Sequence, residues 1–316
     1  MHTQTLHKWE HHHTFGTDER KGAERRTWWV IGLTASMMAV EITAGLLFGS
    51  MALLADGWHM GTHAAALGVT VFAYIYTRRN ADNPRFSFGT GKVGALGGFA
   101  SAVGLAVVAL LILSESVVRV ASPITIRFDE AIAVAILGLV INLASALILR
   151  DHDHHGHHHD HDDHHHEHHD HNLRGAYLHV LADALTSVLA IVALVAGRQL
   201  GWVWMDPMMG IVGALVIARW SYGLLRETSG VLLDAEISLA QRETIRATLE
   251  SEGDDRVTDL HIWRVGPRHL AAIVSVVSHN PREPEHYKSR LSKHADLVHV
   301  TVEVHACTEE PAAHGC

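Results

Sequence analysis

Six long apolar segments limit what this chain can fold into more than any other feature of its sequence. Each is close to the ~20 residues that an α-helix needs to cross a bilayer, and several are long enough to tilt or to extend past it. We therefore expect six transmembrane helices. Their expected bounds are Trp28–Phe48, Met51–Tyr76, Val93–Val118, Glu130–Leu149, Ala176–Gly197 and Pro207–Leu225.

Basic residues set the expected orientation of these helices. Most of them flank the segments on one side of a six-pass arrangement, whereas the opposite loops hold only Arg119, Arg127 and Arg198. Cytoplasmic loops carry the excess of Lys and Arg, so both termini are expected in the cytoplasm. No cleavable signal peptide is evident, and the scattered basic residues suggest no nucleic-acid partner. We expect a multi-pass protein of a plasma membrane, such as a bacterial inner membrane.

Beyond the sixth segment the sequence has the pattern of a small soluble domain. It predicts helices at Ser238–Glu252 and Glu283–His294, and strands at Val257–Val265, Leu270–Ser278 and Val298–His305. The order αββαβ indicates a two-layer α+β domain. The expected divisions of the chain are a cytoplasmic tail at 1–27, a transmembrane domain at 28–230, a cytoplasmic α+β domain at 231–306 and a tail at 307–316.

Two of the apolar segments carry metal-ligand side chains four residues apart. His59 and His63 lie in the second segment, and His179 and Asp183 lie in the fifth. This spacing puts both members of a pair on one helix face, and ionisable groups at membrane depth mark a site or a pathway by default. We expect the two pairs to enclose one divalent cation, with Asp56 as an outer partner or an extra ligand. A lone buried histidine more often bonds a neighbouring carbonyl, but two such pairs favour the metal site.

The donor set determines which ions the site would suit. Three imidazole nitrogens and one carboxylate oxygen favour Co²⁺, Ni²⁺ and Zn²⁺ over hard cations such as Mg²⁺. Each ligand must lose its proton to bind metal, so metal binding releases protons. With an unperturbed pKa of ~6.5, histidine suits this competition near neutral pH. The metal is then cargo, protons are the counter-ion, and no resident cofactor is expected.

Three more polar residues lie within the apolar segments. Glu41, Asn142 and Asp206 could line a cavity, relay protons or bond between helices. For Glu41 and Asp206 the expectation leans towards function, and for Asn142 towards packing.

Histidine is abundant, with 29 copies against 25 lysines and arginines together. The tract at 151–171 holds thirteen His, six Asp, one Glu and one Gly, so it has no apolar side chain for a core. We expect this cytoplasmic loop to chelate divalent metals with low selectivity. The candidate loop ligands are His154, His155, His157, His158, His159, His161, His164, His165 and His166. For the histidines of the N-terminal tail, loose metal binding and no role are equally open.

Five stretches of the sequence resemble the cation diffusion facilitator family. They are SMALLADGWHM, RFSFGTGK, LHVLADALTSV, MDPMMG and DLHIW, and they extend over most of the chain. The resemblance implies proton-coupled export of divalent transition metals by a homodimer with six transmembrane helices and a metallochaperone-like cytoplasmic domain. It also implies that His59, His63, His179 and Asp183 form the transport site.

The departures from the family pattern concern the choice of metal. Many zinc-transporting members have Asp where this chain has His63, and the pairing HxxxH with HxxxD resembles the cobalt- and nickel-exporting branch. Zinc would still bind such a site well. A second family site, in the loop before the third segment, is expected to be absent because Phe86 and Thr90 replace its histidines. The resemblance further implies that Lys92 and Asp234 pair and interlock two protomers.

The family's metal site in the soluble domain is matched only in part. Glu303 and His305 fall near its last-strand ligands, but Thr258 and Val274 occupy the places of two histidines. For His261, a structural role and a ligand role are equally open.

Four functions are considered. The leading one is a proton-coupled exporter of Co²⁺ and Ni²⁺, and a Zn²⁺ exporter of the same family is the alternative. A membrane-anchored metal buffer or sensor would depend on the His-rich loop, so deletion of 151–171 would abolish its function but not export. An intramembrane metal hydrolase would need an open metal position and a base, as in HExxH. No HExxH occurs in the sequence, and we expect a transporter rather than an enzyme.

Overall fold

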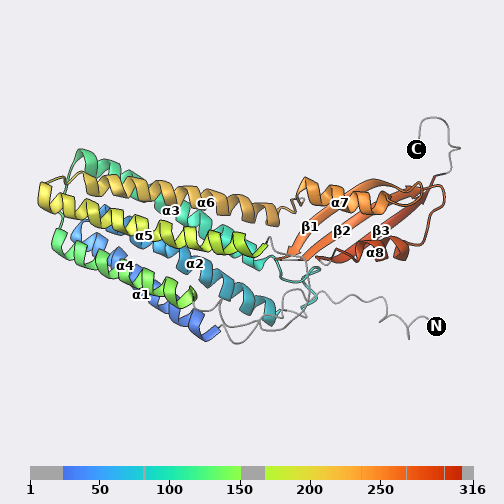
Figure 1. Ribbon diagram of the computed structural model, residues 1–316, viewed down its shortest axis with the longest axis horizontal. Helices are drawn as coiled ribbons and strands as arrows, with labels where there is room; N and C mark the ends of the chain where they lie inside the picture. The colour runs from blue at the N-terminus through green and yellow to red at the C-terminus, as the bar shows by residue number, and fades with distance from the viewer. Residues whose placement is uncertain are drawn as a thin grey trace. The chain divides into compact units, whose positions relative to one another are not determined.

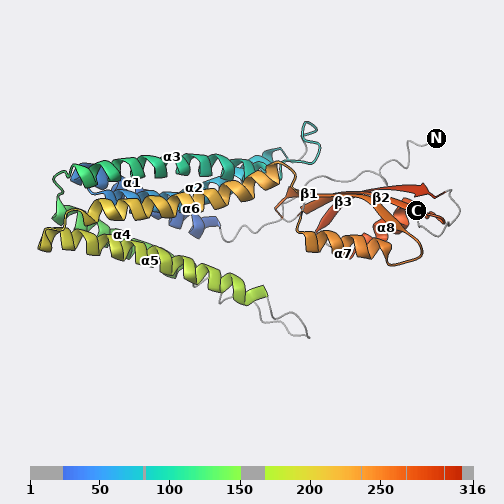
Figure 2. The ribbon, with the colours of Figure 1, turned by 90° about the horizontal axis from the view of Figure 1, so that it is seen from above.

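The computed structural model describes residues 24–80, 83–150, 168–235, 237–267, 269–294 and 296–307. The chain forms two compact units, which we describe separately (Figures 1 and 2). Of the described residues, those within 24–69, 100–150 and 168–225 form the bundle unit, and those within 70–99 and 226–307 form the sheet unit.

Six long helices correspond to the six apolar segments. They are α1 (Glu24–Phe48), α2 (Met51–Arg79), α3 (Val93–Ala121), α4 (Phe128–Arg150), α5 (His168–Leu200) and α6 (Met205–Leu232). Within the described residues, α3 and α6 are long and apolar enough to cross a membrane, and α1 and α5 contain shorter apolar stretches at Gly32–Phe48 and Ala184–Leu200. Large apolar side chains such as Leu46, Leu110 and Leu215 are exposed, as expected for surfaces that face lipid.

Helix α2 packs between two apolar clusters in the bundle unit. Its residues Met51, Leu54 and Ala55 pack with side chains of α3 and α6. On another face, Leu53 packs with side chains of α1, α4 and α5. Since α2 takes part in both clusters, a change in its position would affect both groups of helices.

Glycines allow α1 and α2 to approach each other closely. A Cβ at Gly45 would lie 2.9 Å from the backbone nitrogen of Leu54, and one at Gly57 would lie 3.0 Å from the backbone nitrogen of Ile42. Small residues at helix contacts are typical of membrane bundles, where tight packing replaces the hydrophobic driving force. This contact fixes the α2 backbone on either side of Asp56.

Gly57→Ala is expected to destabilise the bundle by about 1–3 kcal/mol, because the added methyl meets backbone atoms that cannot move aside. The purified protein in detergent should therefore unfold at a lower temperature than wild type. Gly104→Ala is the control, since a Cβ at Gly104 would have open space around it. Equal melting temperatures for the two variants would show that the α1–α2 contact is looser than described.

The sheet unit contains five elements after α6, in the order that the sequence predicts. They are α7 (Leu239–Glu250), β1 (Arg256–Gly266), β2 (His269–Ser278), α8 (Pro284–Leu291) and β3 (Leu297–Ala306). β1 pairs antiparallel with β2, and β2 pairs parallel with β3. The two helices cover one face of the sheet (Figure 2), with Leu249, Tyr287 and Leu291 buried against strand residues. The other face carries the exposed polar residues of β1 and β3.

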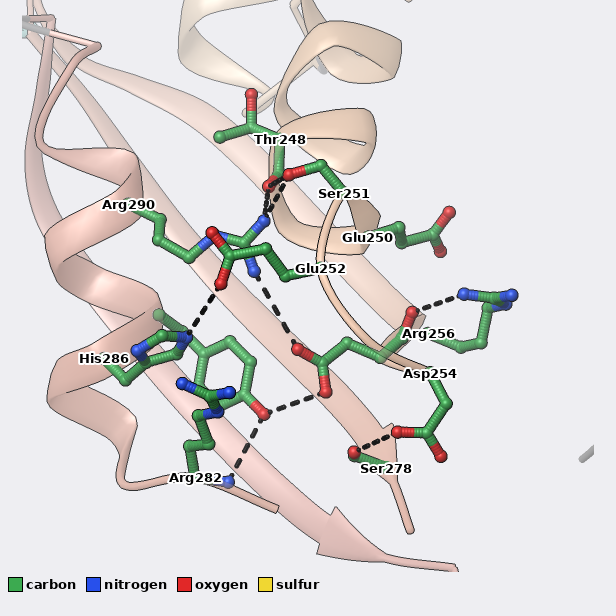
Figure 3. Close-up of polar contacts among 12 residues, drawn as sticks. Thr248, Glu250, Ser251, Glu252, Asp254, Arg256, Ser278, Arg282, His286 and Arg290 are labelled. Atoms are coloured by element: carbon green, nitrogen blue, oxygen red, sulfur yellow. Dashed lines mark hydrogen bonds and ion pairs between the residues drawn. The ribbon is translucent and has the colours of Figure 1, made fainter. Parts of the chain in front are cut away.

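A polar cluster fastens the helices to the end of the sheet (Figure 3). Asp255 accepts a hydrogen bond from the Tyr287 hydroxyl at 3.2 Å and pairs with Arg290 at 3.8 Å. Nearby, the backbone N–H and the ring of His279 hold the pKa of Asp254 well below its usual range. These contacts join the α7–β1 connection to α8 and to the end of β2, which gives them a structural role.

The segment that joins α2 to α3 packs against the sheet. The Phe88 ring contacts the Trp263 ring edge-on at 5.8 Å and the His299 ring at 5.4 Å between centroids. A Cβ at Gly91 would collide with the carbonyl of Val265, so only glycine fits there. Residues 83–92 are thus part of the packing of the sheet unit.

The expected pair of Lys92 and Asp234 is present within one chain. Asp234 follows the end of α6 in a left-handed conformation, with φ of 54°, which aspartate tolerates better than most residues. The pair therefore joins the start of α3 to the end of α6. Its expected role in interlocking two protomers stays a prediction.

Candidate metal centre

A hydrogen bond between buried side chains joins α2 to α5. The hydroxyl of Ser187 donates to the carboxylate of Asp56 at 2.8 Å. The two residues are 0% and 5% exposed, so the bond is shielded from water. A bond to a charged acceptor in such a place is stronger than one between neutral groups. It fixes which turn of α5 lies opposite which turn of α2.

The register of the two helices follows from this bond. α2 and α5 run in opposite directions (Figure 1). Along α2, His59 lies three residues after Asp56, or ~4.5 Å further along the helix axis. His63 lies seven residues after Asp56, or ~10.5 Å further. On α5, Asp183 lies four residues before Ser187, or ~6 Å away, and His179 lies eight residues before it, or ~12 Å away. Because the helices are antiparallel, these distances run in the same direction as those along α2. The backbone therefore brings the two pairs to matching levels.

Of the four proposed ligands, the structure describes the side chain of His59 only. It is half-buried, and its backbone carbonyl accepts a hydrogen bond from the Thr62 hydroxyl at 2.7 Å. His63, His179 and Asp183 lie in the helices as expected, but their side chains are outside the described set. Among the described side chains there is no group of three or more His, Cys, Asp or Glu placed to hold a metal. The four-ligand site stays a prediction, supported by the helix register.

Asp56 is engaged with Ser187 rather than exposed to a cavity. Its carboxylate lies one turn from His59, on the first turns of α2, and is almost fully buried. Of the two roles that the sequence left open, this contact favours the outer one, in which Asp56 aligns α2 and α5 next to the ligands. Outer partners of this kind orient metal ligands without touching the ion.

Glu41 and Asp206 are buried carboxylates with different surroundings. Glu41, on α1, is 0% exposed and lies against Gly57 of α2 and Gly138 of α4. Neither of its carboxylate oxygens has a hydrogen-bond partner within the described part of the chain. Asp206 instead accepts three hydrogen bonds from the start of α2. Asn142 is half-buried on α4, and its expected packing role stays a prediction.

The candidate ligands of the sheet unit lie on two separate strands. His261 is on β1, where its ring contacts Asp259 at 2.9 Å. Glu303 and His305 are on β3, 3.9 Å apart. Since β2 lies between these strands, one chain does not bring the three together, and a metal site here would need donors from elsewhere. Their role as ligands stays a prediction.

The other candidates fall in two places. Phe86 packs edge-on against Tyr76, with 6.4 Å between centroids, and Thr90 is buried. The nine candidate histidines of the loop tract and the histidines of the N-terminal tail lie outside the described residues.

Two serines are structurally important although the sequence reasoning missed them. No sequence pattern pointed to Ser187, because serines are common in apolar helices and nothing around Ser187 marks it as structurally important. A pattern did point to Ser50, since it directly precedes α2 and serine is a preferred residue at a helix start. Its hydroxyl indeed accepts the N–H of Leu53 at 3.1 Å.

The sequence is similar to one known family domain and to several known proteins. The cation efflux transmembrane domain matches residues 28–233. The zinc transporter ZitB of Escherichia coli is 32% identical over 302 residues, covering 93% of this chain and 91% of that protein. The metal cation efflux system protein CzcD of Cupriavidus metallidurans is 30% identical over 306 residues, covering 94% and 92%. A cadmium, cobalt and zinc/H⁺–K⁺ antiporter of Bacillus subtilis is 28% identical over 252 residues, covering 79% and 77%.

Proposed function

The chain belongs to the cation efflux family, also called the cation diffusion facilitators, and on this premise we propose that it exchanges cytoplasmic Co²⁺ and Ni²⁺ for protons. Membership itself makes it a membrane transporter of metal cations. The observation that supports the mechanism best is the Asp56–Ser187 bond, because it aligns the His59/His63 turn with the His179/Asp183 turn.

Proton exchange follows from the chemistry of these ligands. Imidazole and carboxylate bind metal only when deprotonated, and histidine changes charge near neutral pH. Metal arriving from the cytoplasm displaces protons, and protons arriving from the other side displace metal. The relative from Bacillus subtilis is named an antiporter, which supports this direction of coupling.

The protein that carries out this exchange is proposed to be a homodimer of six-pass chains in a plasma membrane, with both termini in the cytoplasm. The excess of basic residues on one side supports the orientation. The C-terminal α+β domain, with its proposed likeness to metallochaperones, would then lie in the cytoplasm with the His-rich loop.

Two cargoes have separate support. His63 adds a nitrogen donor where many zinc-transporting members have a carboxylate, and this favours Co²⁺ and Ni²⁺. The names of the relatives favour Zn²⁺, alone or with cadmium and cobalt. We propose Co²⁺ and Ni²⁺ as the first candidates and Zn²⁺ as the second.

Metal uptake into proteoliposomes under an imposed proton gradient distinguishes a Co²⁺ and Ni²⁺ exporter from a Zn²⁺ exporter. Wild type is expected to transport Co²⁺ and Ni²⁺, and His63→Asp is expected to shift the ratio of initial rates towards Zn²⁺ by about tenfold, or ~1.4 kcal/mol of discrimination. Thr62→Val, on the neighbouring position of α2, is the control and should leave the ratio unchanged. If wild type prefers Zn²⁺ and His63→Asp changes nothing, the cobalt and nickel assignment is wrong.

A further inference from the structure

The start of α2 is held by a buried carboxylate of α6. Asp206 accepts hydrogen bonds from the Ser50 hydroxyl at 2.6 Å, the Met51 N–H at 2.8 Å and the Ala52 N–H at 3.2 Å. Ser50 and Asp206 are 0% and 1% exposed. A negative charge at a helix N-terminus is favourable, and the three bonds all go to one turn of α2. We call this set the Asp206 clamp.

Neighbouring elements hold the same turn. The guanidinium of Arg119, on α3, donates to the carbonyl of Gly49 at 2.8 Å, and the N–H of Arg127 donates to the carbonyl of Phe48 at 3.0 Å. The cavity that Asp206 and Arg119 line here has only about 10 Å³, room for one water at most. No ion could pass through packing of this kind without a rearrangement.

Below the clamp, α2 and α6 are in close contact for two further turns. A Cβ at Gly210 would lie 2.8 Å from the Cβ of Met51, and one at Gly213 would lie 2.7 Å from the Cβ of Ala55. Asp206, Gly210 and Gly213 lie on one face of α6. The seam between the two helices is therefore closed from the clamp to the residue that precedes Asp56.

The other end of the bundle is arranged differently. The α1–α2 turn and the α5–α6 turn lie at one end (Figure 1). From that end, α5 diverges from α6 towards its own N-terminus (Figure 2). In the proposed orientation the end with the turns faces the outside of the cell, so the helices are drawn together on the outer side.

We propose that Asp206 is a positioning residue that keeps the α2–α6 seam, and with it the outer end of the metal pathway, closed until the clamp is released. The clamp suits this role because its three bonds share one acceptor group and one helical turn, so they form or break together. Alternating access requires an element with two discrete arrangements. This inference rests on the proposed transport function and orientation.

The closure can be tested by labelling, without any metal gradient. Cys307 and Cys316 are replaced by serine, and Ala214→Cys places a thiol in the buried cluster of α2, α3 and α6. A membrane-impermeant maleimide is then applied from outside to oriented proteoliposomes. Asp206→Asn is expected to raise the labelling rate about tenfold, since an amide lacks the charge and one acceptor oxygen. Ser50→Ala removes one of the three bonds to Asp206 together with the bond from the Leu53 N–H, and it keeps the carboxylate. It is expected to raise the labelling rate less.

The matched control is Asp129→Asn. Asp129 is a carboxylate of the same unit that pairs with Arg198 at 2.9 Å and is largely exposed, so its loss should leave the labelling rate unchanged. Unchanged labelling in both Asp206→Asn and Ser50→Ala overturns the proposal, and so does an equal rise in all three variants. If Asp206→Asn does not fold, Ser50→Ala alone decides.

Transport by the same vesicles gives a second readout. An outer end that opens more easily depletes the inward-facing state, so Asp206→Asn is expected to raise the KM for metal on the cytoplasmic side several-fold without a matching loss of kcat. If wild type moves no metal, the proposed function fails, whereas the labelling result still shows whether the clamp closes the seam.

Discussion

His59→Ala is expected to reduce metal transport in proteoliposomes by about a hundredfold or more. Loss of an outer partner of a metal ligand already costs about 10- to 100-fold in affinity, and His59 is proposed to bind the ion itself. The remaining donors would be two imidazoles and one carboxylate, which leaves an open position for water. Initial rates of Co²⁺, Ni²⁺ and Zn²⁺ uptake, with metal affinity measured by calorimetry, give the size of the loss.

Thr62→Val is the matched control for this variant. Thr62 is one turn along α2 and bonds to the His59 carbonyl, so its replacement perturbs the same part of the helix without removing a donor. Transport should stay within about twofold of wild type, since the threonine bond is only partly buried. If His59→Ala transports all three metals as well as Thr62→Val does, His59 is not a ligand.

Asp56→Ala is expected to weaken metal binding by about 10- to 100-fold although Asp56 does not touch the ion in the proposed site. The substitution removes the acceptor of the Ser187 hydroxyl and leaves that hydroxyl buried without a partner. A bond of this kind to a charged group contributes about 1.5–3 kcal/mol, so the melting temperature should fall as well. Without this hydrogen bond, α5 is free to shift along α2. Such a shift would separate the His59/His63 pair from the His179/Asp183 pair.

Ser187→Ala tests the alignment of α2 with α5 while it keeps the carboxylate of Asp56. It is expected to weaken metal binding in the same direction but less, and the double variant should be no worse than Asp56→Ala alone, because the two residues act as one pair. Ser221→Ala is the control, since Ser221 is also buried and bonds to the carbonyl of Ala102. It should lower stability and leave metal affinity unchanged. If Ser187→Ala and Ser221→Ala affect affinity equally, the α2–α5 register is not what holds the site.

The helices were predictable because their apolar segments are long, but the helix ends were not. α5 begins at His168, eight residues before the apolar segment that predicts it, and α6 continues to Leu232, beyond Leu225. Hydropathy indicates the part of a helix that lies in lipid, whereas backbone hydrogen bonds continue into polar residues. The strands were predictable to within one residue at each end, because apolar alternation and the Gly266–Pro267 turn limit them closely.

The candidate site was predictable as residues on helix faces, and its alignment was not. Spacing alone put His59 with His63 and His179 with Asp183, since four residues make about one turn. Nothing in the sequence indicates which turn of α5 faces Asp56, because that depends on a contact between residues 131 positions apart. The sequence likewise indicated Asp206 as important without its partners, which are the Ser50 hydroxyl and two backbone N–H groups at the start of another helix.

The packing of residues 83–92 against the sheet limits how this chain can be shortened. A protein cut after α6 would keep Phe86, Phe88 and Val93 but lose Val265, which lines the same pocket, and would lose the Trp263 and His299 rings that contact Phe88. Apolar side chains of residues 83–93 would then be exposed, and exposed apolar patches favour aggregation. Residues 83–93 and the C-terminal domain therefore belong to one packing unit, and a shortened chain would need a polar loop between α2 and α3.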